Sequence, residues 1–484
     1  MPARCSARCS VVTRVGEPTG SGRSAGPKKS ARGTPSRGKS AKGKAGAKKA
    51  GMARSTALQV LLQVEDGVSL SALQTTRINP LDDSRDRALC QELAYGVLRW
   101  RWKLDVLIAA LLKKALKKKD SDIQWVLRLA LYELLECRSP DYAVINDAVL
   151  LVRQRRKNWA TGLVNAVLRH FLREKESLLL QLDGDEAIYS HPPWLLEKIR
   201  ADWPQHWRQL LQANNQRPPL WLRVNARQSS REDYAAELAQ AGHETQPHPY
   251  VESALMLTQS TDVQGLPGFA RGRVSVQDAG AQLAAWLLPV QPGQRVLDLC
   301  AAPGGKTCHL LERYPQIRQL LAVEKDPARM ARVKENLARL QLEAECRVMD
   351  ARDIATPDNI GRFEAILIDA PCSASGVIRR HPDIKTLRRE QDIAPLCDLQ
   401  ARILSAAWQV LAPGGQLLYV TCSVFHQENQ QQITRFLEKT ADASVNMPTV
   451  DWGVSCSVGR QLLPGEEHAD GFYFCLLQKA AIQS

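Results

Sequence analysis

The sequence predicts an α/β protein with an all-α front part, a small α+β connector and a doubly wound parallel sheet at the back. In residues 52–185, apolar residues recur at i, i+3, i+4 and i+7, which is typical of packed amphipathic helices. Beyond residue 290, short apolar runs alternate with helical segments, which is typical of a parallel sheet covered on both faces. The chain has 484 residues, 44% hydrophobic and 24% charged, which is enough for two or three domains with their own cores.

Residues 1–51 are predicted to form a disordered basic tail. Residues 1–50 contain thirteen Lys or Arg and one acid, Glu17, so they carry most of the net charge of +14. A segment rich in Gly, Ser, Ala, Lys and Arg cannot bury a core. It is either a basic arm for RNA phosphates or an extension ahead of a natural start at Met52, where the first helical pattern begins.

Residues 52–185 are predicted to be a helical bundle, because segments such as DIQWVLRLALYELLEC keep the helical period and polar joints separate them. Basic residues cluster in KKALKKKD and RQRRK. Such runs form either a solvated face or a face that contacts RNA. Trp100, Trp102 and Trp159 lie among the bases and either stack on nucleobases or pack in the core.

Residues 186–290 are predicted to form a small α+β connector module. RPPLWLRVN is strand-like after its prolines, and SSREDYAAELAQAG is a helix. Ser229 or Ser230 is the expected cap of that helix, and Gly242 is its expected stop.

Residues 291–484 are predicted to form the doubly wound sheet, in which right-handed crossovers place ligands at the carboxyl ends of the strands. The expected strands are residues 295–299, 320–324, 345–349, 365–369 and 417–421. The apolar runs are too short to span a membrane, and no secretory signal is recognisable. The twelve cysteines lack zinc-finger spacing, so we expect reduced thiols, no metal and a cytoplasmic location.

The segment VLDLCAAPGGKT is a candidate cofactor loop between a strand and a helix. Its small residues let the backbone approach a ligand, but the pattern matches neither GxGxxG nor a phosphate-binding GxxxxGK[ST] loop. Glu324 ends the next strand, where an acid can accept hydrogen bonds from two ribose hydroxyls. Asp350 ends the strand after that and is placed to contact an adenine. Each acid alone is as well explained as a loop residue or helix cap, but the series predicts a nucleoside cofactor without a pyrophosphate, such as S-adenosylmethionine.

Two cysteines are expected at the same edge of the sheet. FEAILIDAPCSASG ends a strand at Asp369 and places Cys372 after Pro371, which takes the chain out of the sheet. LLYVTCS ends the neighbouring strand at Cys422. A lone cysteine is usually a buried small residue, but two at adjacent strand ends beside a cofactor loop predict a catalytic pair.

A thiol beside a methyl donor suits methylation at carbon-5 of a pyrimidine. A thiolate that adds to carbon-6 makes carbon-5 nucleophilic enough to take the methyl group. Asp369 is a candidate to bind N3 of the ring and stabilise the charge that addition creates there. The residues alone do not decide which of the two thiols is the nucleophile.

VLDLCAAPGGKT, DAPCSASGVIRRHPD and VTCSVFHQEN resemble the signature segments of the RNA 5-methylcytosine methyltransferases of the Nol/Nop/Sun group. The resemblance covers roughly residues 52–480 and includes a front half similar to the NusB antiterminator fold. It implies a Rossmann-like methyltransferase sheet, S-adenosylmethionine as cofactor and a cytosine of 16S ribosomal RNA as target. It further implies that Cys422 is the nucleophile and that Cys372 assists product release. The cofactor site that it implies consists of Cys300, Ala301, Ala302, Pro303, Gly304, Gly305, Lys306, Glu324, Asp350 and Asp369.

The target carbon cannot be reached inside a stacked helix, so the base must lie in a loop or be flipped out. Arg379, Arg380 and Lys385 in RRHPDIK are expected to contact phosphates near the cleft, and otherwise form a solvated loop. We expect a monomer with no membrane contact. Two other functions stay open from the residues: a non-catalytic RNA-binding or antitermination module, and a methyltransferase that acts on transfer RNA or DNA.

Overall fold

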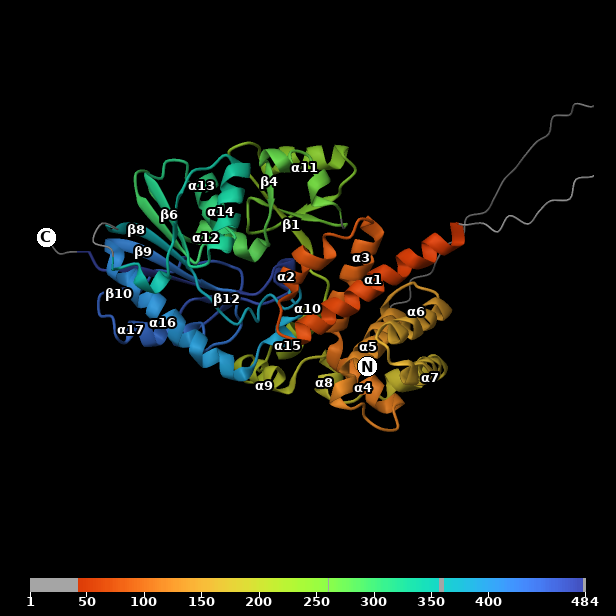
Figure 1. The fold of residues 1–484 in the computed structure, drawn as a ribbon. Coiled ribbons are helices and arrows are strands. Elements are labelled where there is room, and N and C mark those ends of the chain that lie inside the picture. The colour runs from red at the N-terminus through yellow and green to blue at the C-terminus, as the bar shows by residue number, and fades with distance from the viewer. Residues whose placement is uncertain (1–41, 260, 357–360, 482–484) are drawn as a thin grey trace, which may run out of the picture. The chain divides into compact units, whose positions relative to one another are not determined.

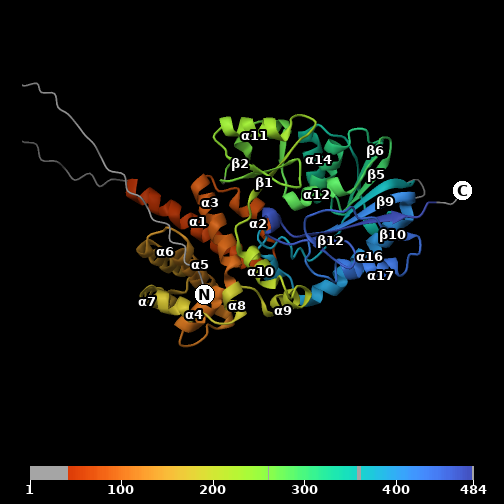
Figure 2. The ribbon, with the colours of Figure 1, turned by 180° about the vertical axis from the view of Figure 1, so that it is seen from behind.

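The computed structural model describes residues 42–259, 261–356 and 361–481, with side chains from residue 51 onward. Contacts divide the chain into two units, Met1–Ala47 and Lys48–Ser484. The second unit contains the elements labelled in Figures 1 and 2. Most of the predicted basic tail lies outside the described residues, although the first helix, α1, already begins at Lys42. Within the described ranges, no helix combines the length and apolar character needed to cross a membrane.

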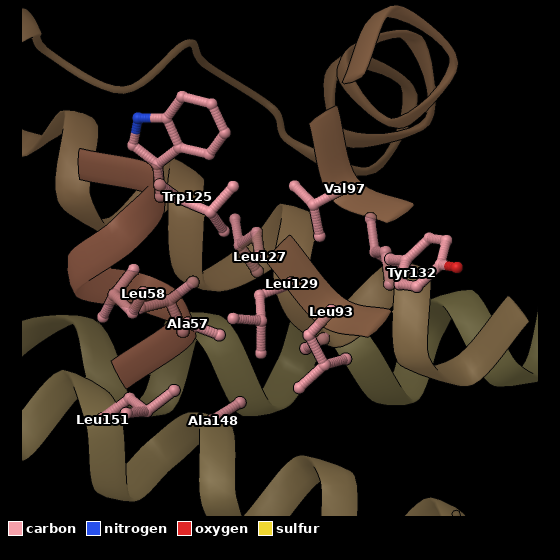
Figure 3. Packing of buried hydrophobic residues seen from close by; sticks show 14 of the residues in the cluster. Ala57, Leu58, Leu93, Val97, Trp125, Leu127, Leu129, Tyr132, Ala148 and Leu151 are labelled. Carbon is pink, nitrogen blue, oxygen red and sulfur yellow. The ribbon is translucent and has the colours of Figure 1, made fainter. Parts of the chain in front are cut away.

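The front part of the second unit is helical, as predicted. Its helices are α1 (Lys42–Glu65), which belongs to this unit from Lys48 onward, α2 (Leu70–Leu73), α3 (Ser84–Arg99), α4 (Arg101–Leu111), α5 (Ser121–Glu136), α6 (Asp141–Gln154), α7 (Thr161–Leu180) and α8 (Asp185–Tyr189). The side chain of Asp83 caps α3 by accepting a hydrogen bond from the backbone N–H of Arg85. Helix α5 is buried along nearly its whole length. Its Trp125, Leu127 and Leu129 therefore form the centre of the bundle core (Figure 3).

The connector begins with two helices, α9 (Pro193–Asp202) and α10 (Trp207–Asn215). There, β1 (Leu220–Val224), β2 (Thr245–Pro247), β3 (Ala254–Leu257) and β4 (Val274–Val276) form an antiparallel sheet in the order β2-β3-β1-β4. Helix α11 (Arg231–Gln240) is capped by Ser230, one of the two serines expected. Gly242 follows it with φ +84°, the left-handed backbone that ends a helix at little cost for glycine.

The back part contains the predicted parallel sheet. The strands β5 (Arg295–Leu299), β6 (Gln319–Glu324), β7 (Glu345–Val348), β8 (Phe363–Asp369) and β9 (Leu411–Thr421) run parallel in the order β7-β6-β5-β8-β9. The chain winds outward in one direction from β5 and in the other from β8. The carboxyl ends of these two neighbouring strands therefore flank the switch point where open α/β sheets bind ligands.

The sheet is mixed rather than purely parallel, which corrects the sequence prediction. Strand β13 (Phe472–Lys479) pairs antiparallel with β9. The shorter strands β10 (Ala443–Val445), β11 (Val454–Ser455) and β12 (Arg460–Leu462) complete this edge through β13. A helix of residues 430–437 and three short strands lie between β9 and β13, so the alternation of strands and helices did not reveal that β13 runs antiparallel to β9.

Helices cover both faces of this sheet (Figure 1). One face carries α12 (Ala279–Leu287), α13 (Gly305–Arg313) and α14 (Pro327–Leu340), and the other carries α16 (Ile393–Val410) and α17 (Gln430–Leu437). The short α15 (Ile384–Leu387) contacts α3 of the front bundle. The predicted α/β fold class, with a helical front part and an α+β connector, is confirmed.

Candidate active site

A cavity of about 430 Å³ opens at the carboxyl ends of the parallel strands, which is within the size range of small-ligand sites. Many of the residues singled out in the sequence line this one cavity: Cys300, Ala302, Glu324, Asp350, Asp369, Cys372 and Cys422. They come from the carboxyl ends of β5, β6, β7, β8 and β9 and from the turns that follow these strands. Residues more than a hundred positions apart therefore meet at the edge that the strand pattern predicts.

The turn after β5 brings the backbone close to this cavity. Cys300 has φ +63° and Gly304 has φ +95°. A Cβ added at Gly304 would lie 3.1 Å from the Cα of Val333, so α14 packs too closely here for a larger residue. Helix α13 begins at Gly305, and its first N–H groups have no partner within the helix.

The acid of β5, Asp298, was not among the predicted site residues. Its side chain is buried, with one oxygen accepting a hydrogen bond from the Thr307 hydroxyl at 2.5 Å and the other left without a hydrogen-bond partner. Burial raises the pKa of Asp298 to about 7, and the charge of Asp369 adds to the rise. A lone acid within the apolar run VLDL was the sequence signal for a functional group at this place.

The two acids expected to bind a nucleoside differ in their surroundings. Glu324 is only 2% exposed, and its Oε1 accepts a hydrogen bond from the N–H of Asp326. Its Oε2 has no hydrogen-bond partner, although the guanidinium of Arg329 lies 3.3 Å away. Asp350 accepts two hydrogen bonds from the guanidinium of Arg352, at 2.7 and 3.0 Å. These bonds lower the pKa of Asp350 to about 2, so it is ionised.

The two candidate thiols meet at the end of β8 and β9. The sulfurs of Cys372 and Cys422 lie 3.4 Å apart. A backbone hydrogen bond from Gly376 to the carbonyl of Cys422 joins the two loops. The hydrogen bond with Cys422 and burial raise the pKa of Cys372 well above its usual range. Two sulfurs at this distance do not both ionise readily, because the second negative charge is opposed by the first.

A partly buried ion pair lies beside the thiols. The ammonium of Lys306 and the carboxylate of Asp369 are 2.6 Å apart. Burial alone would lower the pKa of Lys306, but Asp369 and, more weakly, Cys422 raise it above its ordinary value. Lys306 thus places a positive charge near Cys422 at the cavity.

Glu428 is a second residue that the sequence analysis did not single out. It is fully buried and accepts hydrogen bonds from the loops of both thiols. Glu428 is in the quoted segment VTCSVFHQEN, but two of its partners, Ser373 and Gln400, lie elsewhere in the chain, so no local pattern revealed its role.

The three bases expected to contact phosphates have internal partners instead. Lys385 is 1% exposed, and its ammonium donates to the carbonyls of Arg99 and Ser190, both at 3.0 Å, and to the side-chain oxygen of Asn215 at 2.6 Å. Arg379 is buried against Asp470. The expectation of phosphate contact is therefore wrong for these two residues.

Arg380 is partly exposed and pairs with two carboxylates. Its guanidinium lies 2.6 Å from Asp278 and also binds Asp470. Phosphate contact by Arg380 stays a prediction, in competition with these acids.

The basic run of the front bundle, in contrast, lies at the surface. A hollow of about 970 Å³ is lined by Lys113, Lys114, Lys117, Lys119, Asp120, Trp159, His170, Arg173 and apolar residues of α4 and α7. Trp159 is 59% exposed. Asp120, the acid in this lining, is paired with Lys157 at 2.9 Å. The hollow thus combines uncompensated positive charge with an exposed aromatic ring.

Comparisons with known proteins agree with this architecture. A family model described as 16S rRNA methyltransferase RsmB/F matches residues 285–478. A ferredoxin-like domain model of the RsmF/B-like methyltransferases matches residues 191–264, and a NusB family model matches residues 52–173. The ribosomal RNA small subunit methyltransferase B of Pseudomonas putida is 46% identical over 88% of this chain and 98% of its own length. That of Vibrio cholerae is 47% identical over 88% of this chain and 97% of its own length.

The chain belongs to the ribosomal RNA small subunit methyltransferase B family. Solved structures share its fold. The crystal structure of PH0851 aligns with a TM-score of 0.71 over 88% of this chain and 99% of its own, at 23% identity. A methyltransferase homolog protein from Pyrococcus horikoshii aligns with a TM-score of 0.52 over 60% of this chain and 99% of its own, at 26% identity.

A methyltransferase B family member requires a methyl donor of the S-adenosylmethionine kind, and the cavity fits such a molecule. Glu324 offers a buried oxygen without a hydrogen-bond partner, as a ribose hydroxyl would need. The Cys300–Lys306 turn leaves backbone N–H groups of α13 without helical partners. Among the described residues, no group of three His, Cys, Asp or Glu side chains is placed to hold a metal ion.

Proposed function

We propose that this chain methylates carbon-5 of a cytosine in 16S ribosomal RNA through a covalent bond between Cys422 and the base. The observation that carries the proposal is the pair of sulfurs 3.4 Å apart, which line the same cavity as Glu324 and Asp350. A thiol pair beside a nucleoside site suits a reaction in which one sulfur activates the pyrimidine. The names of the relatives supply the substrate, since they are ribosomal RNA small subunit methyltransferases.

Cys422 acts in this proposal as the nucleophile. Its thiolate adds to carbon-6, and the electron pair of the C5–C6 double bond becomes available at carbon-5. Asp369 and Lys306, paired at 2.6 Å, face the charge that this addition creates on the N3 side of the ring. S-adenosylmethionine, when bound, supplies the methyl group that carbon-5 takes.

Cys372 acts in product release. Carbon-5 loses its proton to water, the C5–C6 double bond re-forms, and the C6–S bond breaks with its electron pair returning to Cys422. An S–H of Cys372 at 3.4 Å stabilises the thiolate that leaves. The raised pKa of Cys372 keeps that S–H in place at neutral pH.

The remaining residues hold the two substrates. We propose that Cys300 to Lys306, Glu324 and Asp350 bind the donor, with Glu324 accepting from the ribose and Asp350 lying on the adenine side. The target cytosine must leave its stack to reach Cys422. We further propose that residues 52–185 act as the RNA-gripping domain, residues 186–290 as the connector and residues 291–484 as the methyltransferase domain.

The test uses purified enzyme, 16S RNA and donor labelled in the methyl group. Wild-type enzyme should transfer label, and bisulfite sequencing should place it on a cytosine. Cys422→Ala should transfer none, whereas Cys372→Ala should accumulate a protein–RNA adduct that survives denaturing gels. Cys346→Ala is the matched control, because Cys346 lies in β7 away from the cavity lining. Turnover by Cys422→Ala, or an adduct formed by Cys422→Ala and not by Cys372→Ala, would contradict the assignment of roles.

A further inference from the structure

Glu428 holds the two thiol loops together. Its Oε1 accepts from the backbone N–H of Ser373 at 2.8 Å and from the amide of Gln400 at 3.0 Å. Its Oε2 accepts from the hydroxyls of Ser373 and Ser423, each at 2.5 Å. A carboxylate has about four acceptor positions, so this one is fully used. Because the two serines directly follow the two candidate thiols in the chain, Glu428 fixes both thiol loops from one point.

The hydroxyl of Ser375 extends this hydrogen-bond network. The Ser375 hydroxyl lies 3.1 Å from the hydroxyls of Ser373 and Ser423 and accepts from the N–H of Val424 at 3.0 Å. All three serines are buried. The sulfur separation is therefore set by a buried polar network, in which the loss of one member leaves others unpaired.

The charge of Glu428 acts unequally on the two sulfurs. It is among the causes that raise the pKa of Cys372, after the hydrogen bond with Cys422, burial and the charge of Cys422. A fixed negative charge disfavours a second anion beside it. Lys306, in contrast, places its positive charge toward Cys422. The site therefore favours the protonated thiol at Cys372, and the positive charge of Lys306 lies on the side of Cys422.

The titratable and charged groups around Cys372 come from several elements. They are Cys422 after β9, Glu428 before α17, Tyr419 within β9, Asp369 at the end of β8, Lys306 of α13 and Arg388 after α15. The guanidinium of Arg388 donates to the carbonyl of Cys372 at 3.5 Å. Arg388 binds the backbone carbonyl, and Lys306 is paired with Asp369. Glu428 is thus the anionic group in this set that is fixed to the Cys372 loop by its own hydrogen bonds.

We propose that Glu428 is a positioning residue that ties the two cysteine loops together and keeps Cys372 as the hydrogen-bond donor of the thiol pair. The effect on catalysis rests on the proposed function. When the C6–S bond breaks, the electron pair returns to Cys422 and the carbon-5 proton leaves to water. The S–H of Cys372 lowers the energy of the departing thiolate. A Cys372 thiolate would instead repel it and slow release.

Glu428→Gln tests the charge while keeping the shape. The amide retains one acceptor, and the serine hydroxyls can turn to accept from its NH2 group. The readout is the alkylation rate of Cys372 against pH, followed by mass spectrometry of its peptide. The midpoint should fall by about one pH unit or more in Glu428→Gln, because a neighbouring negative charge has been removed. Glu438→Gln is the matched control, since Glu438 is an exposed carboxylate just beyond α17 and should leave the midpoint unchanged.

A folded Glu428→Gln enzyme with the wild-type alkylation profile would overturn the proposal. Ser423→Ala tests positioning separately, because it removes the hydroxyl that ties the Cys422 loop to Glu428 and keeps the charge of Glu428. It should lower the methylation rate and leave the alkylation midpoint of Cys372 in place; an unchanged rate would overturn the positioning role, even if Glu428→Gln failed to fold.

The reaction provides a second readout. With RNA and donor, Glu428→Gln should accumulate covalent adduct as the pH is raised, at pH values where wild-type enzyme does not. Absence of adduct in Glu428→Gln, in conditions where Cys372→Ala forms it, would also count against the proposal. If wild-type enzyme forms no adduct and transfers no methyl group, yet Glu428→Gln shifts the alkylation midpoint, the proposed function fails while the effect of Glu428 on Cys372 holds.

Discussion

Basic residues have opposite surroundings in the front bundle and at the thiol end of the sheet. Lys113, Lys114 and Lys117, after α4, are exposed around a hollow that also presents Trp159. Lys385, just beyond the thiol loop, is 1% exposed and bound to three internal oxygens. The same side chain therefore contributes surface potential in one region and holds the fold together in the other. A run of basic residues in a sequence indicates RNA contact only where the folded structure leaves those charges exposed to solvent.

The largest expected effect concerns the buried carboxyl group of Asp298 in β5. Asp298 has a pKa of about 7, above the value of an unfolded aspartate, so the folded protein binds more protons between about pH 4 and pH 7. The stability contribution of Asp298 is thus lost as the pH rises through this window, by an amount on the order of 3 kcal/mol. In Asp298→Asn this loss is absent. The free energy of unfolding of the variant, relative to wild type, should therefore rise from pH 4 to pH 7.

Urea unfolding at several pH values measures this difference. Asp398→Asn is the matched control, because Asp398 is exposed on α16, and its difference from wild type should stay nearly constant with pH. If the difference in the free energy of unfolding between Asp298→Asn and wild type is also constant with pH, then Asp298 is ionised in the fold, and buried and exposed acids behave alike here.

The second-largest expected effect concerns Lys385, the buried base. Lys385→Met keeps the apolar stem and leaves the carbonyls of Arg99 and Ser190 and the oxygen of Asn215 without their donor. An unpaired buried acceptor costs about 1–3 kcal/mol, and relief from burying an ammonium offsets part of that. We expect a net loss of about 2 kcal/mol in urea unfolding. The salt dependence of RNA binding should not change, because Lys385 releases no counterion.

Lys439→Met is the control for this experiment, as Lys439 is exposed and should leave stability within about 0.5 kcal/mol. A lower salt slope in folded Lys385→Met would show that Lys385 does reach phosphate, and would remove the contrast between the two regions.

The sequence predicted those features that depend on local pattern. Strands β5 to β9 follow from short apolar runs, and their order places Cys372 and Cys422 at one edge because parallel strands share a direction. The fates of Arg379 and Lys385 depend on Asp470, Ser190 and other groups far away in the chain. Side-chain pairs of this kind have no period and no fixed spacing, so a run of bases did not reveal them.

The same reason explains the site residues that were missed. Glu428 gains its role from Ser373, 55 residues earlier, and Asp298 from burial rather than from a motif. Strand β13 was missed because its pairing with β9 is antiparallel and falls outside the parallel pattern that the alternating strands and helices predict. The candidate thiol pair and the cofactor acids were found because they lie at the ends of consecutive strands. The groups that set the ionisation of these residues were not found, because ionisation depends on how the folded chain packs.

The smallest expected effect tests the exposed region. Trp159→Ala removes the ring that the hollow presents, and stacking of a base on an aromatic ring contributes about 1–3 kcal/mol. We expect about tenfold weaker binding of 16S RNA in a filter assay, with little change in the rate at saturating RNA, because Trp159 lies outside the cavity of the thiols. Trp159→Phe should keep most of the affinity. Tyr142→Ala is the matched control, since Tyr142 is exposed on α6 outside the hollow.

Replacing Lys113, Lys114 and Lys117 by Ala together separates charge from stacking in the same hollow. Three lost phosphate contacts should reduce the slope of log affinity against log salt by about 2 for a single-stranded contact, whereas Trp159→Ala should leave the slope in place. Equal slopes for the triple variant and wild type would mean that these lysines are solvated like any exposed charge. The front bundle and the thiol end would then differ in burial but not in their part in RNA binding, and the grip on the RNA would have to lie elsewhere on the chain.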